Sequence, residues 1–157
     1  MRKTTEYIIN DKDNKKNRDN GKVFLIEEMP AYIAERWCYK ALSGMIQGGL
    51  DVSLVANAIE FASEIMALLS LANFFRIDEA TQNQLLDELM KYITIIPDNG
   101  KGKPRKLISG TQDSDDIQEA STLMELKLEA LELNLNFLKV VGSQVLNRYF
   151  TKPNQKK

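Results

Sequence analysis

The sequence contains no histidine and only one cysteine, Cys38. Histidine is the side chain most used for proton transfer near neutral pH and is the commonest metal ligand, so its absence excludes histidine-based catalysis. A single cysteine cannot form a disulfide within the chain, which is typical of proteins in a reducing cytoplasm. Because Cys38 follows Trp37 in an apolar helical stretch, we expect a structural thiol rather than a nucleophile.

The sequence also lacks a phosphate-binding loop, a signal peptide and a membrane-spanning run. The segment Gly100-Lys101-Gly102-Lys103 does not stand between a strand and a helix, which is the setting that a phosphate-binding loop requires. Met1-Arg2-Lys3 is followed by polar residues, and the most hydrophobic run, 65–75, is too short to cross a bilayer. We therefore expect a soluble, non-enzymatic protein with no catalytic, cofactor-binding or metal-binding residues and no membrane partner.

Charge is nearly balanced overall but unevenly distributed. The net charge is −1, so no global field attracts nucleic acid. The cations nevertheless gather in two segments: Lys12, Lys15, Lys16, Arg18 and Lys22, and then Lys101, Lys103, Arg105 and Lys106. The two segments could straddle phosphates, but neither carries aromatic residues that stack on unpaired bases. We favour solvated loops with no nucleic-acid partner.

The chain length and the hydrophobic periodicity predict the fold class. A chain of 157 residues that is 43% hydrophobic is long enough for one domain, expected over 1–150 and followed by a disordered tail, 151–157. Helices are expected over 30–47, 51–75, 78–92 and 116–150. Gly48-Gly49 suits a helix end, and the helix over 51–75 is expected to be central to the core. Phe74, Phe75 and Phe137 are expected in the core, with an exposed partner site as the alternative.

Two β-hairpins are expected beside the helices. The first pairs 6–9 with 23–26 across a polar loop, 10–21. The second pairs 93–96 with 105–108 around 97–102, whose proline, asparagine and glycine residues are strong turn formers. The predicted fold class is therefore mainly α (α+β), a helical bundle of about four helices with one or two small β-hairpins.

Asp115 and Asp116 stand directly in front of the last apolar helical run. Two adjacent acids could bind a metal, but in this position they more often cap a helix. Asp116, with Glu119 three residues later, forms a start for the helix that is similar to a capping box.

The segment 115–141 predicts a helix with two separate apolar faces. The first face contains Leu123, Leu126, Ala130, Leu133, Phe137 and Val140, and the second contains Met124, Leu128, Leu131, Leu135 and Leu138. Glu125, Glu129, Glu132, Asn136 and Lys139 form a third, solvated side. Because Leu126, Leu133 and Phe137 have the bulk expected of a core face, we assign self-association or partner binding to the other face: Met124, Leu128, Leu131 and Leu135.

Two segments carry a family likeness. The first runs from Val23-Phe24-Leu25-Ile26 through Met29-Pro30-Ala31 to Ala34-Glu35-Arg36-Trp37; the second runs from Arg105-Lys106-Leu107 through Asp116-Ile117 and Ser121-Thr122-Leu123 to Asn136-Phe137-Leu138. Together they resemble tail assembly chaperones of long-tailed bacteriophages. The shared order of elements covers most of the chain from Lys22 to Phe150, and it includes no catalytic signature.

The resemblance implies a non-enzymatic helper in the host cytoplasm that is absent from the mature virion. Its implied partners are the tape measure protein, which it keeps soluble, and the tail tube protein, which polymerises around the tape measure; association into a homo-oligomer is also expected. A tape measure exposes extended apolar helix surface, which suits a chaperone with a second apolar face. The alternatives are a phage nucleic-acid-binding or regulatory protein that uses the basic loops, and a minor structural virion protein.

Overall fold

The computed structural model describes residues 1–51, 72–107 and 116–149, with side chains described as far as 134 in the last of these ranges. Most of the helix expected over 51–75 and the whole tail expected over 151–157 therefore lie outside the described residues. The chain divides into two compact units, each built from two stretches of sequence. Unit 1 contains Met1–Met29 and Leu86–Leu131, and unit 2 contains Pro30–Leu85 and the chain from Glu132 onward.

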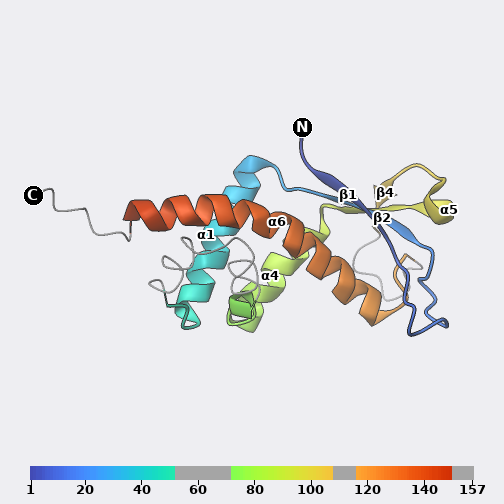
Figure 1. Ribbon diagram of the computed structural model, residues 1–157, viewed down its shortest axis with the longest axis horizontal. Coiled ribbons are helices and arrows are strands. Elements are labelled where there is room, and N and C mark those ends of the chain that lie inside the picture. The colour runs from blue at the N-terminus through green and yellow to red at the C-terminus, as the bar shows by residue number, and fades with distance from the viewer. Residues whose placement is uncertain (52–71, 108–115, 150–157) are drawn as a thin grey trace, which may run out of the picture. The chain divides into compact units, whose positions relative to one another are not determined.

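Unit 1 is built on a four-stranded antiparallel sheet with the order β1-β2-β3-β4 (Figure 1). The strands are β1 (Thr4–Ile8), β2 (Val23–Glu27), β3 (Ile93–Ile96) and β4 (Arg105–Lys106). Both expected hairpins are confirmed, because β1 pairs with β2 and β3 pairs with β4. The pairing of β2 with β3 was not expected, and it joins the two hairpins into one sheet.

The expectation of a four-helix bundle with small hairpins is wrong, because this continuous sheet gives a mixed α+β fold. Val23, Phe24 and Ile26 of β2 are buried, as are Ile93, Ile95 and Ile96 of β3. Successive side chains of a strand point to opposite sides of the sheet, so each of these strands buries residues on both sides. Such runs are typical of central strands rather than of a hairpin with one solvated side.

Unit 2 begins with α1 (Ala31–Gln47), whose ends follow the sequence signals. The Pro30 carbonyl accepts hydrogen bonds from the backbone N–H groups of Ile33 and Ala34 at 2.9 and 2.8 Å. At the other end, Gly49 has φ +98°, a left-handed conformation that glycine adopts without strain. Gly48 is required by space, because a Cβ at this position would lie 2.3 Å from the Arg76 carbonyl oxygen.

Trp37 of α1 anchors the described core of unit 2. Its ring stacks on that of Phe74 at a centroid distance of 6.0 Å, and its indole Nε1 donates a hydrogen bond to the Leu85 carbonyl at 3.0 Å. Phe74 is fully buried, as expected, but the expectation was wrong for Phe75, which is exposed. The Phe137 side chain lies outside the described side chains.

The helices α4 and α5 follow α1 in the described part of the chain. The helix α4 (Glu79–Met90) begins at Asp78, whose carboxylate accepts a hydrogen bond from the Thr81 N–H at 2.9 Å, as a helix cap does. The four-residue α5 (Pro97–Gly100) forms the expected turn between β3 and β4, with Asp98 and Asn99 at positive φ. The sequence predicted the start of α4 and the turn correctly, because both depend on neighbouring residues, whereas the capping role of Asp78 is a finding of the structure.

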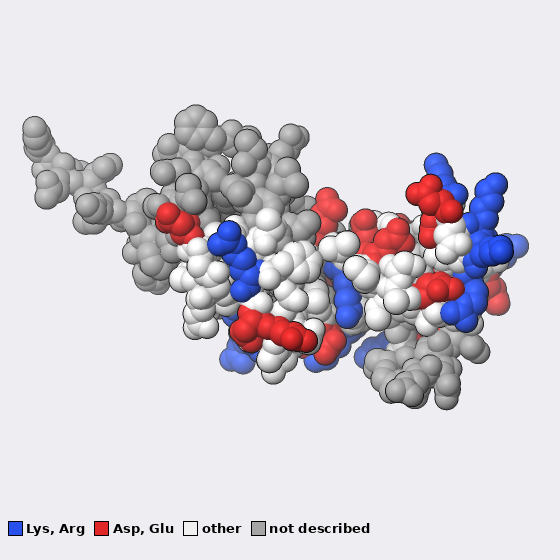
Figure 2. Space-filling model, turned by 90° about the horizontal axis from the view of Figure 1, so that it is seen from below, with Lys and Arg blue, Asp and Glu red and all other residues white. Residues whose placement is uncertain are grey.

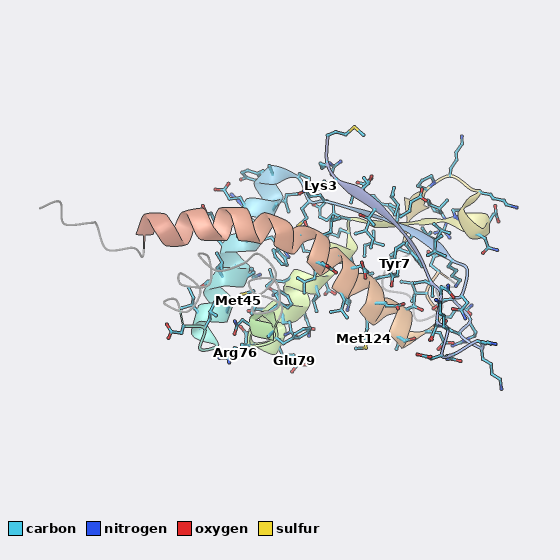
Figure 3. The ribbon with its side chains drawn as sticks, in the orientation of Figure 1. Lys3, Tyr7, Met45, Arg76, Glu79 and Met124 are labelled. Atoms are coloured by element: carbon cyan, nitrogen blue, oxygen red, sulfur yellow. The ribbon has the colours of Figure 1, made fainter. Side chains whose placement is uncertain are left out.

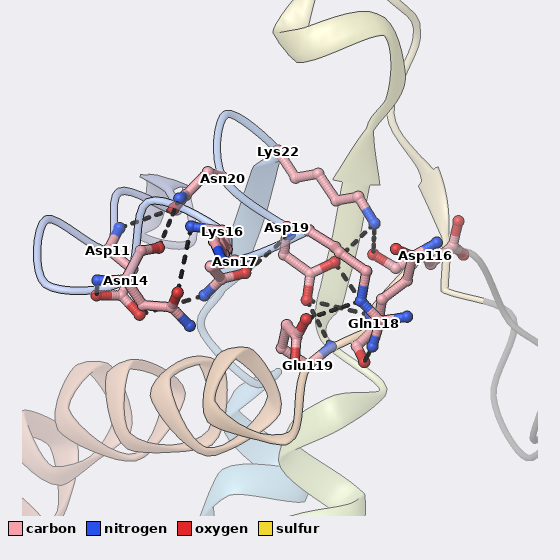
Figure 4. Close-up of polar contacts among 11 residues, drawn as sticks. Asp11, Asn14, Lys16, Asn17, Asp19, Asn20, Lys22, Asp116, Gln118 and Glu119 are labelled. Carbon is pink, nitrogen blue, oxygen red and sulfur yellow. Dashed lines mark hydrogen bonds and ion pairs between the residues drawn. The ribbon is translucent and has the colours of Figure 1, made fainter.

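The start of α6 (Ala120–Tyr149) is held by a residue that the sequence did not indicate. The Asp19 carboxylate accepts hydrogen bonds from the Gln118 N–H at 3.0 Å and the Glu119 N–H at 2.8 Å (Figure 4). It also forms an ion pair with Lys22 Nζ at 2.7 Å. Burial of this fully enclosed carboxylate would raise its pKa, but the hydrogen bonds from Lys22 and the two N–H groups outweigh burial, so the pKa is lowered.

The expected cap, Asp116, has a different role. Its carboxylate binds the Arg105 guanidinium of β4 through two hydrogen bonds, and Lys22 Nζ donates to its backbone carbonyl at 3.2 Å. The expectation that Asp116 caps α6 is therefore wrong. A planar guanidinium binds a carboxylate in two places, and the residue pattern around Asp116 does not reveal this competing partner.

The 10–21 loop is shaped by its own asparagines and aspartates so that Asp19 reaches α6 (Figure 4). The Asp11 carboxylate accepts hydrogen bonds from the N–H groups of Asp13 and Asn14, and the Asn17 side-chain oxygen accepts one from the Asp19 N–H at 2.8 Å. The Asn20 side-chain oxygen accepts a hydrogen bond from the Asp11 N–H at 2.8 Å. Such local side-chain hydrogen bonds replace a regular ladder in turns.

We predict that Asp19→Asn lowers the free energy of unfolding by about 3 kcal/mol at pH 7, because Lys22 loses its ion partner and the N–H groups lose a charged acceptor. The folded-state pKa of Asp19 is lowered, so its contribution is present above the unfolded value of about 4 and is lost as pH falls below it. Urea unfolding at pH 7 and pH 3 should show the difference between the proteins shrinking at the lower pH. A difference independent of pH would contradict this role.

We predict that Trp37→Ala lowers the free energy of unfolding by about 3 to 5 kcal/mol, because the substitution removes a buried ring and its hydrogen bond to Leu85. The matched control is Tyr32→Ala on the same helix, whose side chain is exposed, with an expected change within about 0.5 kcal/mol. Chemical denaturation of both variants measures the difference. Equal effects would show that Trp37 is not a core anchor.

Candidate partner-binding surface

The described residues contain no cluster suited to a metal ion. No group of three or more cysteine, aspartate or glutamate side chains suited to a metal ion occurs among them. Cys38 is fully buried, and burial, followed by the charge of Glu35, raises the pKa of its thiol to about 11. A thiol held in its neutral form is a poor nucleophile, in keeping with the structural role expected for Cys38. Asp115 lies outside the described residues.

The first half of α6 has one buried side and one exposed apolar side. Leu126 and Ala130, expected on the core face, are buried. Met124 is 65% exposed and Leu128 is 41% exposed, and they stand one helical turn apart. Figure 3 shows Tyr7 of β1 on the sheet side of α6 and Met124 on the side that faces away from the sheet. We call Met124 and Leu128 the α6 apolar pair.

The structure divides the four residues expected to bind partners. Met124 and Leu128 are exposed, Leu131 is fully buried, and the Leu135 side chain lies outside the described side chains. Met124 and Leu131 are seven residues apart, so on an ideal helix they point within about 20° of each other but lie roughly 10 Å apart along the axis. The same side of α6 is therefore exposed near Met124 and buried near Leu131, a change that a helical projection of the sequence does not reveal. Among the described side chains of the predicted face, the exposed ones are the α6 apolar pair.

Glutamates border the α6 apolar pair on the side nearest β1. Of the glutamates on the expected solvated side, Glu125 and Glu132 are exposed and Glu129 is half-buried. Tyr7 faces Glu125 and Glu129: burial, followed by the charges of these two carboxylates, raises the pKa of its phenol. This contact fixes the first half of α6 against β1 and turns the acidic side of the helix toward that strand.

The basic clusters separate into structural cations and solvated cations. Arg18 pairs with Glu119, Lys22 with Asp19 and Arg105 with Asp116. The remaining lysines are exposed and form no ion pair with any residue that the structure describes: Lys12, Lys15, Lys16, Lys101, Lys103 and Lys106. A Cβ on Gly21 would lie 3.8 Å from Asn99, so the two loops meet, and Figure 2 shows lysine and arginine side chains gathered at that end of unit 1.

A second exposed apolar row, on α1 in unit 2, was not identified from the sequence. Tyr32, Tyr39 and Ile46 are exposed, and their spacing of seven residues places them along one side of the helix. Arg36 lies over the Tyr32 ring at 4.6 Å, and the Tyr39 hydroxyl donates to Glu35 at 3.2 Å. The spacing was visible in the sequence, but the row is bordered by charged residues that also fit an ordinary solvated side.

No protein-family model matches the chain, nor does any curated protein or solved structure. The resemblance to tail assembly chaperones therefore remains a hypothesis that depends on the two segments quoted above. Among the described helices, none is both long and apolar enough to cross a membrane.

We predict that Met124→Asp and Leu128→Asp leave the folded state intact, because both side chains already contact solvent. Leu131→Asp is the contrasting variant, because it places a carboxylate where the native side chain is fully buried, and it should unfold the protein. Far-UV circular dichroism and thermal unfolding measure both effects. Unfolding of the Met124 or Leu128 variant would show that the exposed surface lies elsewhere.

Proposed function

We propose that the protein is a tail assembly chaperone of a long-tailed bacteriophage, which binds the tape measure protein in the host cytoplasm and is absent from the mature virion. The observation that carries the proposal is the α6 apolar pair, which exposes Met124 and Leu128 on adjacent turns of a helix whose opposite side is buried. A long helical partner with an apolar surface is matched by such a pair in a helix-to-helix contact. The sequence resemblance supplies the identity of that partner.

The size of the pair suits a contact that must later be released. Burying one methionine and one leucine side chain contributes about 1.5 to 3 kcal/mol each, whereas association costs at least about 4 kcal/mol. One copy would therefore bind weakly and reversibly. Several copies along one tape measure, with contacts between neighbouring copies, would hold it through avidity and would yield as the tail tube protein polymerises around it.

The charges around the pair fit the same role. Glu125 and Glu132 are exposed on the neighbouring side of α6, so the apolar area is small and bordered by carboxylates. Small apolar patches with charged borders resist non-specific association, whereas large ones aggregate. A chaperone needs this combination, because it must bind apolar surface without precipitating itself.

The test is co-expression with the tape measure protein encoded near this chain, followed by affinity purification. The amount of tape measure protein that co-purifies with the double variant Met124→Asp, Leu128→Asp should fall at least about tenfold, because the new charges oppose burial of this surface. Asn83→Asp is the control, since it adds a carboxylate at an exposed polar position of a different helix, α4. Undiminished co-purification by the double variant would reject the proposed surface.

The main alternative is a phage nucleic-acid-binding or regulatory protein, and the exposed lysines of the two adjoining loops favour it. They would contact phosphates without reading bases, so binding would weaken steeply with salt. This alternative would be supported if the unmodified protein is retained on DNA at low salt and a quadruple variant is not. The quadruple variant combines Lys15→Gln, Lys16→Gln, Lys101→Gln and Lys103→Gln. Detection in purified particles would support a minor structural virion protein.

A further inference from the structure

The strand β1 forms an outer edge of the sheet, and its backbone groups alternate in direction. The Ile9 N–H donates to the Lys22 carbonyl at 3.0 Å, and the Lys3 carbonyl accepts from the Glu28 N–H at 2.9 Å. Residues 3, 5, 7 and 9 therefore direct their backbone groups toward β2, and Thr4, Glu6 and Ile8 direct theirs outward. Among the strands that the structure describes, β2 is the one neighbour of β1.

Among the features that normally prevent further pairing, this edge has one charged side chain, Glu6, but no proline and no lysine within the strand. The opposite edge, β4, has two residues, Arg105 and Lys106, and follows Pro104. By contrast, β1 has five residues and no proline, and Thr4, Glu6 and Ile8 are exposed. An edge strand of ordinary length without proline or a lysine can add another strand. The outward N–H and C=O groups of β1 thus provide a template for an extended peptide.

Carboxylates border this edge on both sides of the sheet. Glu6 lies on one side, and Glu125 lies on the other, where the first half of α6 faces Tyr7. Neither Glu6 nor Glu125 forms an ion pair with a residue in the described ranges. An added strand points its side chains alternately to the two sides of the sheet. A basic residue at an odd or an even position of that strand would therefore lie near one of the two carboxylates.

The same charges disfavour a second copy of β1 as the added strand. In a symmetric antiparallel pair, the register that aligns all five residues places Glu6 of one copy opposite Glu6 of the other. Like charges directly opposite each other destabilise a strand pair. Registers that avoid this contact align fewer residues, and therefore form fewer ladder hydrogen bonds.

We propose that the outer edge of β1 binds an extended, lysine- or arginine-bearing segment of a partner protein as a fifth strand of the sheet. Backbone hydrogen bonds to Thr4, Glu6 and Ile8 provide affinity, and Glu6 and Glu125 select basic side chains. This surface does not use Met124 or Leu128, although Glu125 also borders the α6 apolar pair, so it does not depend on the proposed function. The double variant Met124→Asp, Leu128→Asp should retain it.

The probe is an acetylated peptide of alternating lysine and valine, seven residues long, with an otherwise identical glutamate–valine peptide as the charge control. Binding is measured by fluorescence titration, and amide hydrogen exchange locates it. The lysine peptide should slow exchange of the Thr4, Glu6 and Ile8 amides, whereas those of Thr5 and Tyr7 are already protected by β2. Binding without this alternating protection, or equal binding of the glutamate peptide, would overturn the proposal.

Two substitutions at Glu6 distinguish the contribution of its backbone N–H to peptide binding from that of its charge. Glu6→Gln keeps the N–H and removes the charge, so it should weaken lysine-peptide binding and reduce its salt dependence. Glu6→Pro also lacks the charge but removes the outward N–H, and it should bind about three- to tenfold more weakly than Glu6→Gln. Thermal unfolding checks that both variants fold. Equal affinities of two folded variants, or protection of the three amides by self-association without peptide, would reject the proposal.

Discussion

The Asp19 carboxylate is the interaction on which unit 1 depends most. A fully buried charge is costly unless it is paired, and Asp19 meets this condition by binding Lys22 and the N–H groups of Gln118 and Glu119. These partners tie a loop near the start of the chain to the beginning of α6. The direction in which α6 leaves the sheet, and hence the position of Met124 and Leu128, follows from this connection together with the contact between Tyr7 and α6.

Local signals in the sequence were sufficient for most elements. The two hairpins, the start and end of α1, and the start of α4 depend on residues close together in the chain, and they were placed correctly. The connections between distant segments were not predicted. The pattern before α6 offered Asp116 as a cap, whereas the structure uses Asp19 there and pairs Asp116 with Arg105. No spacing rule links residues about a hundred positions apart, and the pairing of β2 with β3 escaped prediction for the same reason.

The candidate surface was predicted in part. Periodicity correctly separated the exposed Met124 and Leu128 from the buried Leu126 and Ala130, because direction around a helix follows from position in the sequence. It placed Leu131 with the exposed residues, although Leu131 is buried. What covers each successive turn depends on other segments, and periodicity along one helix contains no information about them. The acidic border and the open edge of β1 became recognisable after the strand order and the contact of Tyr7 with α6 were known.

The chain order of the sheet has a consequence for synthesis on the ribosome. β1 and β2 emerge first, but β3, the neighbour that pairs with β2 on its other side, is encoded after the whole of α1 and α4. Until β3 arrives, the apolar side chains of β2 have no permanent cover and its second edge is unpaired. Asp19 likewise has to wait for Gln118 and Glu119. Unit 1 therefore completes late and through contacts of large sequence separation, which slow folding and prolong the exposure of strand edges. The proposed chaperone would thus pass through a stage in which its own strand edges are open to association.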